Sequence, residues 1–326
     1  MSPLKTDTVD RHLLYLLHQN SRASLTDLAS ELGCSRETVN YRIANLCKSG
    51  VIRSFVTKMD FGRLGLANYA IYLKLKNLTK DQYAVFIKKL QGHKNVAWIA
   101  SLGGRFDLTI EMSAHTPREL DSRFSALQDL CAGNINDHYI STWVSQYLFG
   151  KKYLWPEKIN LTEATRGQYL SSPTIASVDK LDSRILAAMA NNARMPLAEL
   201  GRHLKVPPTT VSFRLRELER KGVIKGYTLL SHLQDFGYSK YKMLLRVRNF
   251  SKKDEAQLVS FCATHPNVYY CGKTFGNWDF EIEADVQTPV EYQQFLIQLR
   301  SRFESIIYDI ESLPIFEEHL LTFWTE

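Results

Sequence analysis

Two segments carry polar side chains at a spacing suited to hydrogen bonding with the edges of DNA bases. They are SRETVNYR (residues 35–42) and PPTTVSFR (residues 207–214). If each segment is helical with Val39 or Val211 facing inward, the polar residues point outward or flank the exposed face. The N-terminal half of a helix in the major groove lies closest to the bases, and Arg, Asn, Ser and Thr can contact base edges. The pattern favours groove contacts by Arg36, Asn40, Tyr41, Thr209, Ser212 and Arg216, with Pro208 flanking them.

Other residues around these helices are better suited to the phosphate backbone, or to bracing the helices, than to reading bases. The residues expected to hold phosphate or brace the motif are Ser35, Thr38, Arg42, Thr210 and Arg214. Lys48, Arg53, Lys221 and Lys225 follow the helices and would add phosphate attraction. The alternative for either copy alone is an amphipathic helical hairpin used only for packing. Two copies with basic outer faces favour DNA binding.

The elements that must position these side chains form the same pattern twice. Residues 25–52 and 197–224 each predict a short helix, a tight turn, a longer helix and a Gly-Val-Ile stop, which is a helix-turn-helix. A preceding helix is expected over residues 8–18. Ser24 and Ser35 are suited to cap the second and third helices, and Gly33 is suited to a positive φ at the turn. Pro207 and Pro208 take the capping place in the second copy, where proline is tolerated.

The repeat extends far beyond the helical segments. Adding 172 to a position pairs Thr38-Val39 with Thr210-Val211, Gly104 with Gly276 and Asp107 with Asp279. The chain is therefore a tandem duplication of one unit of about 150 residues.

After each helical segment the periodicity changes to that of strands. In the first unit we expect strands over 68–76, 96–102, 106–112 and 137–148, and helices over 78–93 and from Pro117. This β-α-β-β-α-β order predicts an α+β fold with a ferredoxin-like domain in each unit. The expected domains are 1–60 and 179–232 (winged helix-turn-helix) and 61–152 and 233–326 (ferredoxin-like), with a polar linker over 153–178.

Charge is distributed unevenly along the chain. Residues 180–230 hold ten Lys and Arg against four Asp and Glu, whereas residues 279–318 are rich in Asp and Glu. A basic head joined to an acidic body fits a polyanion-binding module, and ordinary solvated surface is the alternative.

The five cysteines form no CxxC pair and are expected to be reduced thiols. No apolar run approaches the roughly 18 residues that cross a membrane, and no signal peptide is evident, so we expect a cytoplasmic protein with no membrane partner.

These residues resemble the Lrp/AsnC (feast/famine) transcriptional regulators. The resemblance lies in Leu25-x-x-Leu28-Ala29-x-x-Leu32-Gly33, in Thr38-Val39-x-x-Arg42-Ile43 with its second copy Thr210-Val211-x-x-Arg214-Leu215, and in the turns Gly104-Arg105-Phe106-Asp107 and Gly276-Asn277-Trp278-Asp279. It implies double-stranded DNA as a partner and homo-oligomers formed through the ferredoxin-like sheets. It also implies an amino acid or related effector near Gly104, Asp107, Gly276 and Asp279. A carboxylate that caps its own turn is the alternative for each aspartate.

The duplication departs from single-unit members of that family. We expect a covalent pseudo-dimer, in which both ferredoxin-like domains pair within one chain and two different recognition helices meet an asymmetric operator.

An enzyme is the main rival, because siroheme decarboxylases resemble this architecture. Their sheets carry histidines, whereas Trp98 and Tyr270 stand in the strands here, and His93 and His265 fall at helix-to-strand loops, where histidine is most often solvated. No catalytic motif, metal site or cofactor-binding loop is visible. A sensor that has lost DNA binding is the third interpretation.

Overall fold

The structure is a computed structural model that describes residues 7–131, 133–156 and 174–325. Residues 157–173 of the expected linker lie outside this range. The first unit begins with a helical head and the strand that follows it. These elements are α1 (Thr8–Gln19), α2 (Leu25–Leu32), α3 (Arg36–Lys48) and β1 (Ile52–Met59). The rest of the unit comprises β2 (Ala67–Leu75), α4 (Lys80–Gln91), β3 (Val96–Leu102), β4 (Leu108–Ala114), α5 (Pro117–Leu130), β5 (Ile135–Leu148) and the short 3-10 helix η1 (Lys152–Leu154).

The second unit repeats this order. Its head comprises α7 (Lys180–Met189), α8 (Leu197–Leu204), α9 (Pro208–Arg220) and β6 (Ile224–Ser231). The remaining elements are η4 (Gln234–Phe236), β7 (Ser239–Val247), α10 (Lys252–Thr264), β8 (Val268–Phe275), β9 (Phe280–Val286), α11 (Pro289–Arg302) and β10 (Ile307–Leu321).

The helix boundaries follow the expected caps. The Ser24 hydroxyl accepts from the Asp27 amide, and the Ser35 hydroxyl accepts from the Thr38 amide, each at 3.1 Å. Gly33 ends α2 with φ of 64°, and Pro208 stands in the first turn of α9. These contacts satisfy amides that have no partner inside the helix, so local sequence sets the ends of the recognition helices.

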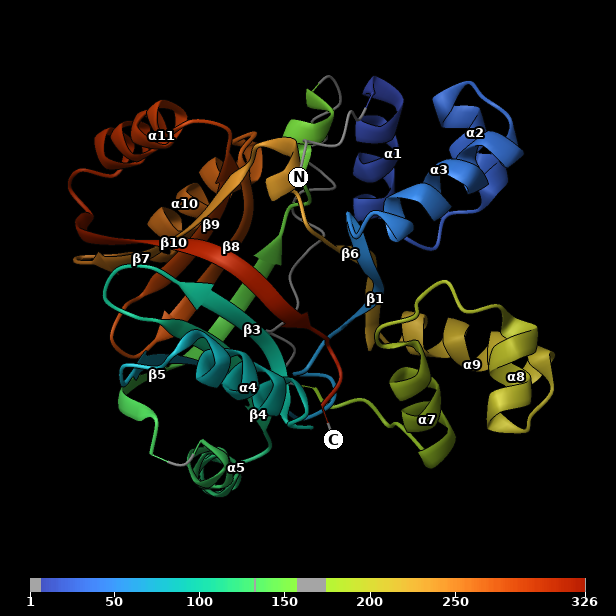
Figure 1. Ribbon diagram of the computed structural model, residues 1–326, viewed down its shortest axis with the longest axis horizontal. Helices are drawn as coiled ribbons and strands as arrows, with labels where there is room; N and C mark the ends of the chain where they lie inside the picture. Colours follow the sequence, from blue (N-terminus) through green and yellow to red (C-terminus); the bar gives the residue numbers. More distant parts are fainter. Residues whose placement is uncertain (1–6, 132, 157–173, 326) are drawn as a thin grey trace.

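The eight strands of the two ferredoxin-like domains close into one barrel, in the order β10-β3-β4-β2-β5-β8-β9-β7. The seams between the units are β5 with β8, where Leu148 lies opposite Tyr270, and β10 with β3, where Leu321 lies opposite Trp98. Helices α4 and α5 cover one side of the barrel and α10 and α11 the other (Figure 1). The two domains thus pair within one chain, as expected of a pseudo-dimer.

Closure of the barrel changes the burial expected for the strands. The alternation of apolar residues at 69, 71, 73 and 75 in the sequence predicts a half-buried strand with this side toward the core, and these residues do face the helices. The opposite face of β2 is also buried, because Ala70 and Tyr72 point into the barrel interior. The half-buried assignment was therefore wrong, since each sheet uses the other sheet, and not solvent, to cover its second face.

A two-stranded ribbon joins the heads to the barrel. Strands β1 and β6 pair antiparallel, with Val56 opposite its repeat equivalent Thr228, so the pseudo-twofold axis passes through this pair. The heads lie to one side of the barrel, at the right in Figure 1. Among the described residues, no helix combines the length and the apolar character needed to cross a bilayer.

Candidate functional site

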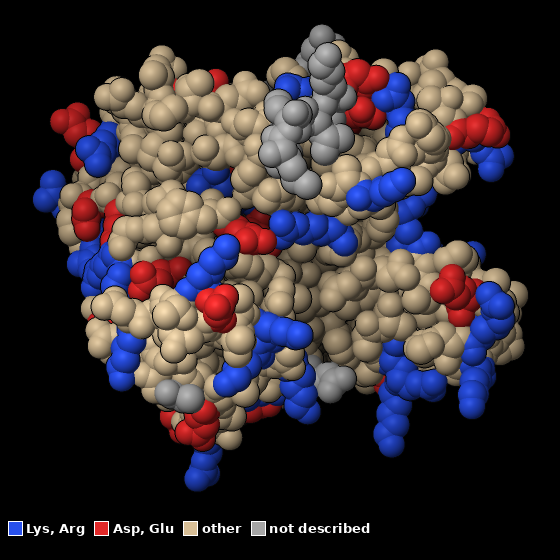
Figure 2. All heavy atoms as spheres, in the orientation of Figure 1, with Lys and Arg blue, Asp and Glu red and all other residues tan. Residues whose placement is uncertain are grey.

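The two third helices expose the residues expected to read bases. In α3, Val39 is fully buried, whereas Arg36 and Asn40 are exposed and Tyr41 is 67% exposed. In α9, Val211 is fully buried, and the exposed face carries Pro208, Thr209 and Arg216, with Ser212 half-buried beside them. Arg216 donates to the Ser212 hydroxyl at 3.2 Å. Each head thus presents a polar ridge that a hydrophobic core holds in place, and Figure 2 shows Lys and Arg side chains on both lobes.

Arg42 and Arg214 brace the heads. Arg42 bonds the carboxylates of Asp7 and Asp10 at 2.9 and 2.8 Å, which ties α3 to the start of α1. Arg214 makes the equivalent contacts with Asp179 and Asp182 at 2.7 and 3.4 Å. Both guanidinium groups are therefore used between helices, which is one of the two roles expected of them.

The remaining expected phosphate contacts divide into two groups. Lys48 is exposed at the end of α3, and the half-buried Thr38 and Thr210 lie in the first turns of their helices. Three cations have protein partners: Arg53 donates to the Glu318 carbonyl at 2.7 Å, Lys221 to the Ser177 carbonyl at 2.8 Å, and Lys225 lies 3.5 Å from Asp60. A phosphate would have to compete with these partners.

A reciprocal arginine contact fixes one head against the other. Arg22 donates to the carbonyl of Ala193 at 2.5 Å, and its repeat equivalent Arg194 donates to the carbonyl of Ser21 at 2.7 Å. Arg22 also lies over the ring of Tyr227 at 5.6 Å, and Arg194 over the ring of Phe55 at 5.7 Å. We call these four side chains and two carbonyls the arginine clamp. Because each half of the clamp spans both units, it joins the loop before α2 to the loop before α8.

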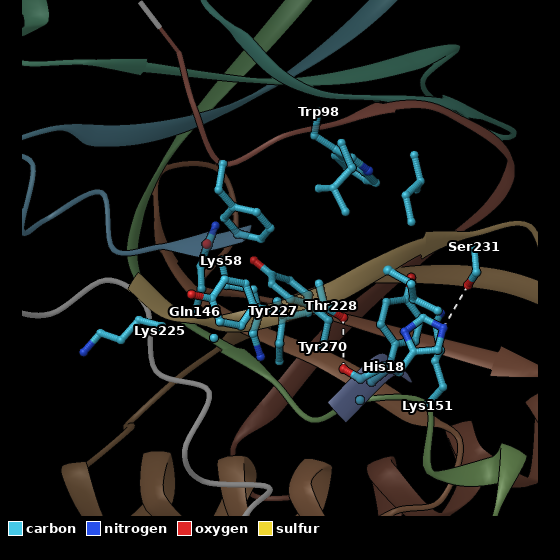
Figure 3. A pocket seen from close by; sticks show the side chains of 18 of the residues that line it. His18, Lys58, Trp98, Gln146, Lys151, Lys225, Tyr227, Thr228, Ser231 and Tyr270 are labelled. Atoms are coloured by element: carbon cyan, nitrogen blue, oxygen red, sulfur yellow. Dashed lines mark hydrogen bonds between the residues drawn. The ribbon is translucent and has the colours of Figure 1, made fainter. Parts of the chain in front are cut away.

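A cavity of about 660 Å³ lies between the β1–β6 ribbon and the barrel (Figure 3). It straddles the pseudo-twofold axis, because both members of repeat pairs line it, including Glu111 with Glu283 and Trp98 with Tyr270. The lining histidine is His18, which comes from α1 rather than from the sheets and bonds the Ser231 hydroxyl at 2.9 Å. Burial, together with nearby Lys151, Lys240 and Lys58, holds the pKa of His18 well below its usual range.

The barrel interior next to this cavity is ionic. Lys242 bonds Glu281 at 2.6 Å and Glu283 at 2.8 Å, and its ammonium group lies 4.7 Å from the ring centre of Trp98. These charges raise the pKa of Lys242 against the opposing effect of burial. Part of the acid-rich sequence therefore lies inside the barrel, paired with lysines, and is not an acidic surface. The alternation of acidic and apolar residues in FEIEADV (280–286) is the sequence signal for this placement.

The two Gly-x-x-Asp turns lie over strands of the opposite unit. Gly104 approaches Leu313 and Ser312 of β10, and Gly276 approaches Ile140 and Ser141 of β5. Asp107 accepts from the Leu75 amide at 2.8 Å and lies 3.1 Å from Lys74, whereas Asp279 accepts from the Val247 amide at 2.8 Å. Both carboxylates thus hold backbone of the neighbouring strand.

His265, one of the two loop histidines, packs against the aromatic ring of a helix residue. His265 is half-buried, with its ring centre 4.8 Å from that of Phe295, and burial lowers its pKa to about 4. It is not the solvated residue expected from its loop position, because α11 covers it. In the ranges that the structure describes, no group of His, Cys, Asp and Glu is arranged to hold a metal ion.

Comparison with known proteins agrees with this geometry. A family profile described as winged helix-turn-helix DNA-binding matches residues 6–53 and 178–225. An uncharacterized HTH-type transcriptional regulator of Pyrococcus abyssi is 36% identical over 118 residues, which are 35% of this chain and 77% of that protein. The regulatory protein AsnC of Haemophilus influenzae is 26% identical over 132 residues, 40% of this chain and 87% of that protein.

The solved structure of the siroheme decarboxylase NirDL has a similar fold over the whole molecule. It covers 97% of this chain and 93% of its own with a TM-score of 0.60, at 12% sequence identity. At this identity the likeness shows a common fold alone. Two helix-turn-helix heads clamped together on one barrel define a two-headed protein of the DNA-binding regulator class. The chain belongs to the Lrp/AsnC family, as a tandem duplication of the unit found in its relatives.

Proposed function

We propose that this protein is a sequence-specific transcriptional regulator that binds an asymmetric DNA operator with both heads of one chain. In this proposal it acts in the cytoplasm and associates further with copies of itself. The residues proposed to read bases are those expected from the sequence: Arg36, Asn40, Tyr41, Thr209, Ser212 and Arg216.

The observation that carries this proposal is the arginine clamp between two exposed but different recognition helices. The clamp holds one head against the other through Arg22 and Arg194, so the two helices meet DNA as one unit. Their exposed residues differ, with Arg36 and Asn40 in one and Thr209 and Arg216 in the other. Because base-edge contacts depend on side-chain type, two different half-sites at a fixed spacing follow.

The test is selection of bound sequences from a random DNA pool, followed by titration of the selected duplex at two salt concentrations. We expect two unlike half-sites and an affinity that falls steeply with salt. Arg36→Ala should weaken binding about 5- to 150-fold and relax preference in one half-site, and Arg216→Ala should do so in the other, since a base contact is worth about 1–3 kcal/mol. Arg118→Ala, on the exposed face of α5, is the matched control. Equal affinity for two inverted copies of one half-site, or no binding at low salt, would contradict the proposal.

An amino acid or related effector at the Gly-x-x-Asp turns is a separate proposal. Two observations support it: the family membership, and the position of Gly104 and Gly276 over strands of the opposite unit. A ligand at either turn would contact the turn and the strand of the opposite unit. Asp107 and Asp279 would have to keep their backbone contacts while receiving an amino group. Repeating the DNA selection with mixed amino acids tests this, and Asp279→Asn should abolish any change that they cause.

A siroheme decarboxylase-like enzyme is the second candidate. The observation that favours it is the whole-chain fold similarity to NirDL. Titration of the protein with an iron porphyrin discriminates the two, because a bound haem-like ring changes its absorbance spectrum. A change in the porphyrin absorbance spectrum at equimolar protein would support the enzyme candidate, and an unchanged spectrum would reject it.

A further inference from the structure

Glu111 on β4 is the repeat equivalent of Glu283 on β9, but the two carboxyl groups have different surroundings. Glu283 bonds Lys242 at 2.8 Å and accepts from the Tyr269 hydroxyl. The positions equivalent to Lys242 and Tyr269 in the first unit are Ala70 and Ala97. Within the described part of the chain, Glu111 accordingly has no hydrogen-bond or ion-pair partner. The two units therefore share the carboxyl group, but its two partners are present in the second unit alone.

The Glu111 side chain lines the cavity between the ribbon and the barrel. Its strand neighbours on either side are Ala70 of β2 and Trp98 of β3. Tyr270, the repeat equivalent of Trp98, also lines the cavity, and its buried hydroxyl has no hydrogen-bond partner among the described residues. Two polar groups that ordinarily require partners therefore border the same cavity.

The rest of the cavity wall is largely aromatic. Trp98, Tyr227, Tyr269, Tyr270, Phe61 and Phe323 line it, and Figure 3 shows Trp98 on the barrel side and Tyr227 on the ribbon. Aromatic faces attract cations and accept flat apolar groups. A volume of about 660 Å³ is within the range of sites that hold small organic molecules.

The charges around Glu111 favour a cation over an anion. Lys242 is outnumbered by Glu281 and Glu283, which it already bonds. The lysines that line the cavity itself also have partners: Lys151 bonds Asp285, Lys240 bonds Glu318, Lys225 lies near Asp60, and Lys58 is engaged as well. An anionic ligand would have to displace one of these carboxylates, whereas a cation could approach Glu111 directly.

We propose that this cavity binds an organic amine whose ammonium group pairs with Glu111 and the Tyr270 hydroxyl and whose flat or apolar body lies among the aromatic residues. The site is built across the pseudo-axis from unlike halves, which suits a ligand without twofold symmetry. A bound amine would also touch Tyr227 of the arginine clamp, and any effect on the heads through that contact rests on the proposed DNA-binding function.

Binding should release a proton. Burial, with Glu281 and Glu283 nearby, raises the pKa of Glu111 to about 8 against the opposing effect of Lys242, so the group is mostly protonated at pH 7. An incoming ammonium group favours the carboxylate: the Glu111 O–H bond breaks, its proton goes to the buffer, and an ammonium–carboxylate pair forms. Affinity should therefore rise up to about tenfold per pH unit between pH 6 and 7 and level off above pH 8.

The test is calorimetric titration of the full chain, without DNA, using three probes that share one ring: tryptamine (cation), tryptophol (neutral) and indole-3-acetate (anion). We expect tryptamine to bind at least about tenfold more tightly than the other two. Glu111→Gln should remove at least about tenfold of its affinity, and Tyr270→Phe a smaller part, because a single hydrogen bond is worth about 1 kcal/mol. Asp129→Asn, which changes an exposed carboxylate on α5, should leave the affinity unchanged.

Titrations of the unaltered protein in two buffers of different ionisation enthalpy measure proton release without any substitution. Release of a proton on binding and a rise in tryptamine affinity with pH would support the site. The proposal is overturned if tryptamine does not bind, if tryptophol or indole-3-acetate binds equally well, or if Glu111→Gln leaves the affinity unchanged. Since no DNA is present, failure here leaves the proposed DNA-binding function standing.

Discussion

At the scale of single residues, Glu111 links the cavity to the stability of the fold. Its pKa is raised to about 8, so folding favours the protonated form. A raised pKa contributes stability that is fully present below the unfolded-state value, near 4.5, and that is lost as pH rises through about 8. The unaltered protein should therefore become less stable between pH 5 and pH 9 through this group.

Glu111→Gln should flatten that dependence, because the amide cannot ionise. At pH 9 we expect the variant to be more stable by roughly 2–4 kcal/mol, seen as a rise of several degrees in the unfolding midpoint. At pH 5 the two proteins should differ little. Thermal unfolding from pH 5 to pH 9 checks this, with Asp129→Asn as control. Parallel pH curves for Glu111→Gln and the unaltered protein would show that Glu111 is not protonated in the fold.

At the scale of elements, the arginine clamp should set the spacing between the recognition helices. Replacing Arg22 and Arg194 together with alanine removes the donors to Ala193 and Ser21 at the head-to-head contact. We expect a loss of about 1–3 kcal/mol of stability for each carbonyl left without a partner, seen as a lower unfolding midpoint.

The same double variant should also tolerate changes in the spacing between the DNA half-sites. Insertion of a few base pairs between the half-sites should weaken DNA binding by the unaltered protein far more than binding by this variant.

The same DNA series supplies the control for the clamp. Arg118→Ala removes a surface arginine that lies on α5. It should retain both the midpoint and the spacing dependence of the unaltered protein. Identical spacing dependence in the double variant would mean that elements other than the clamp hold the heads.

Much of each element could be predicted from local sequence, because caps and periodicity act locally. Ser24, Ser35 and Gly33 mark helix ends by their own chemistry, and the β2 pattern identifies the face that meets the helices. The second face could not be assigned in this way, since what covers Ala70 and Tyr72 is a sheet from the other unit. Local sequence therefore predicts the recognition helices but not the roles of Glu111 and Lys242, because those roles depend on which strands face each other across the barrel.

At the scale of the whole molecule, the barrel seams join parts of one chain. Strand β5 pairs with β8, and β10 with β3, so closing the barrel requires no second molecule. Unlike the two-chain case, in which mass action makes barrel formation depend on concentration, a chain diluted below the range of any further association should keep a constant unfolding midpoint. Calorimetry over a hundredfold range of protein concentration checks this. A midpoint that falls with dilution would show that association between chains contributes to the barrel's stability.

The covalent seams have a genetic consequence. In a regulator assembled from two separate chains, a defective copy can enter mixed dimers and inactivate normal partners. Here the β5–β8 and β10–β3 seams are filled from within, so a chain with a damaged head cannot capture half of a healthy barrel. When a chain with a damaged head is co-expressed with a normal chain, the normal chain should therefore still form its own barrel. Either recognition helix can also change its DNA preference without altering the other.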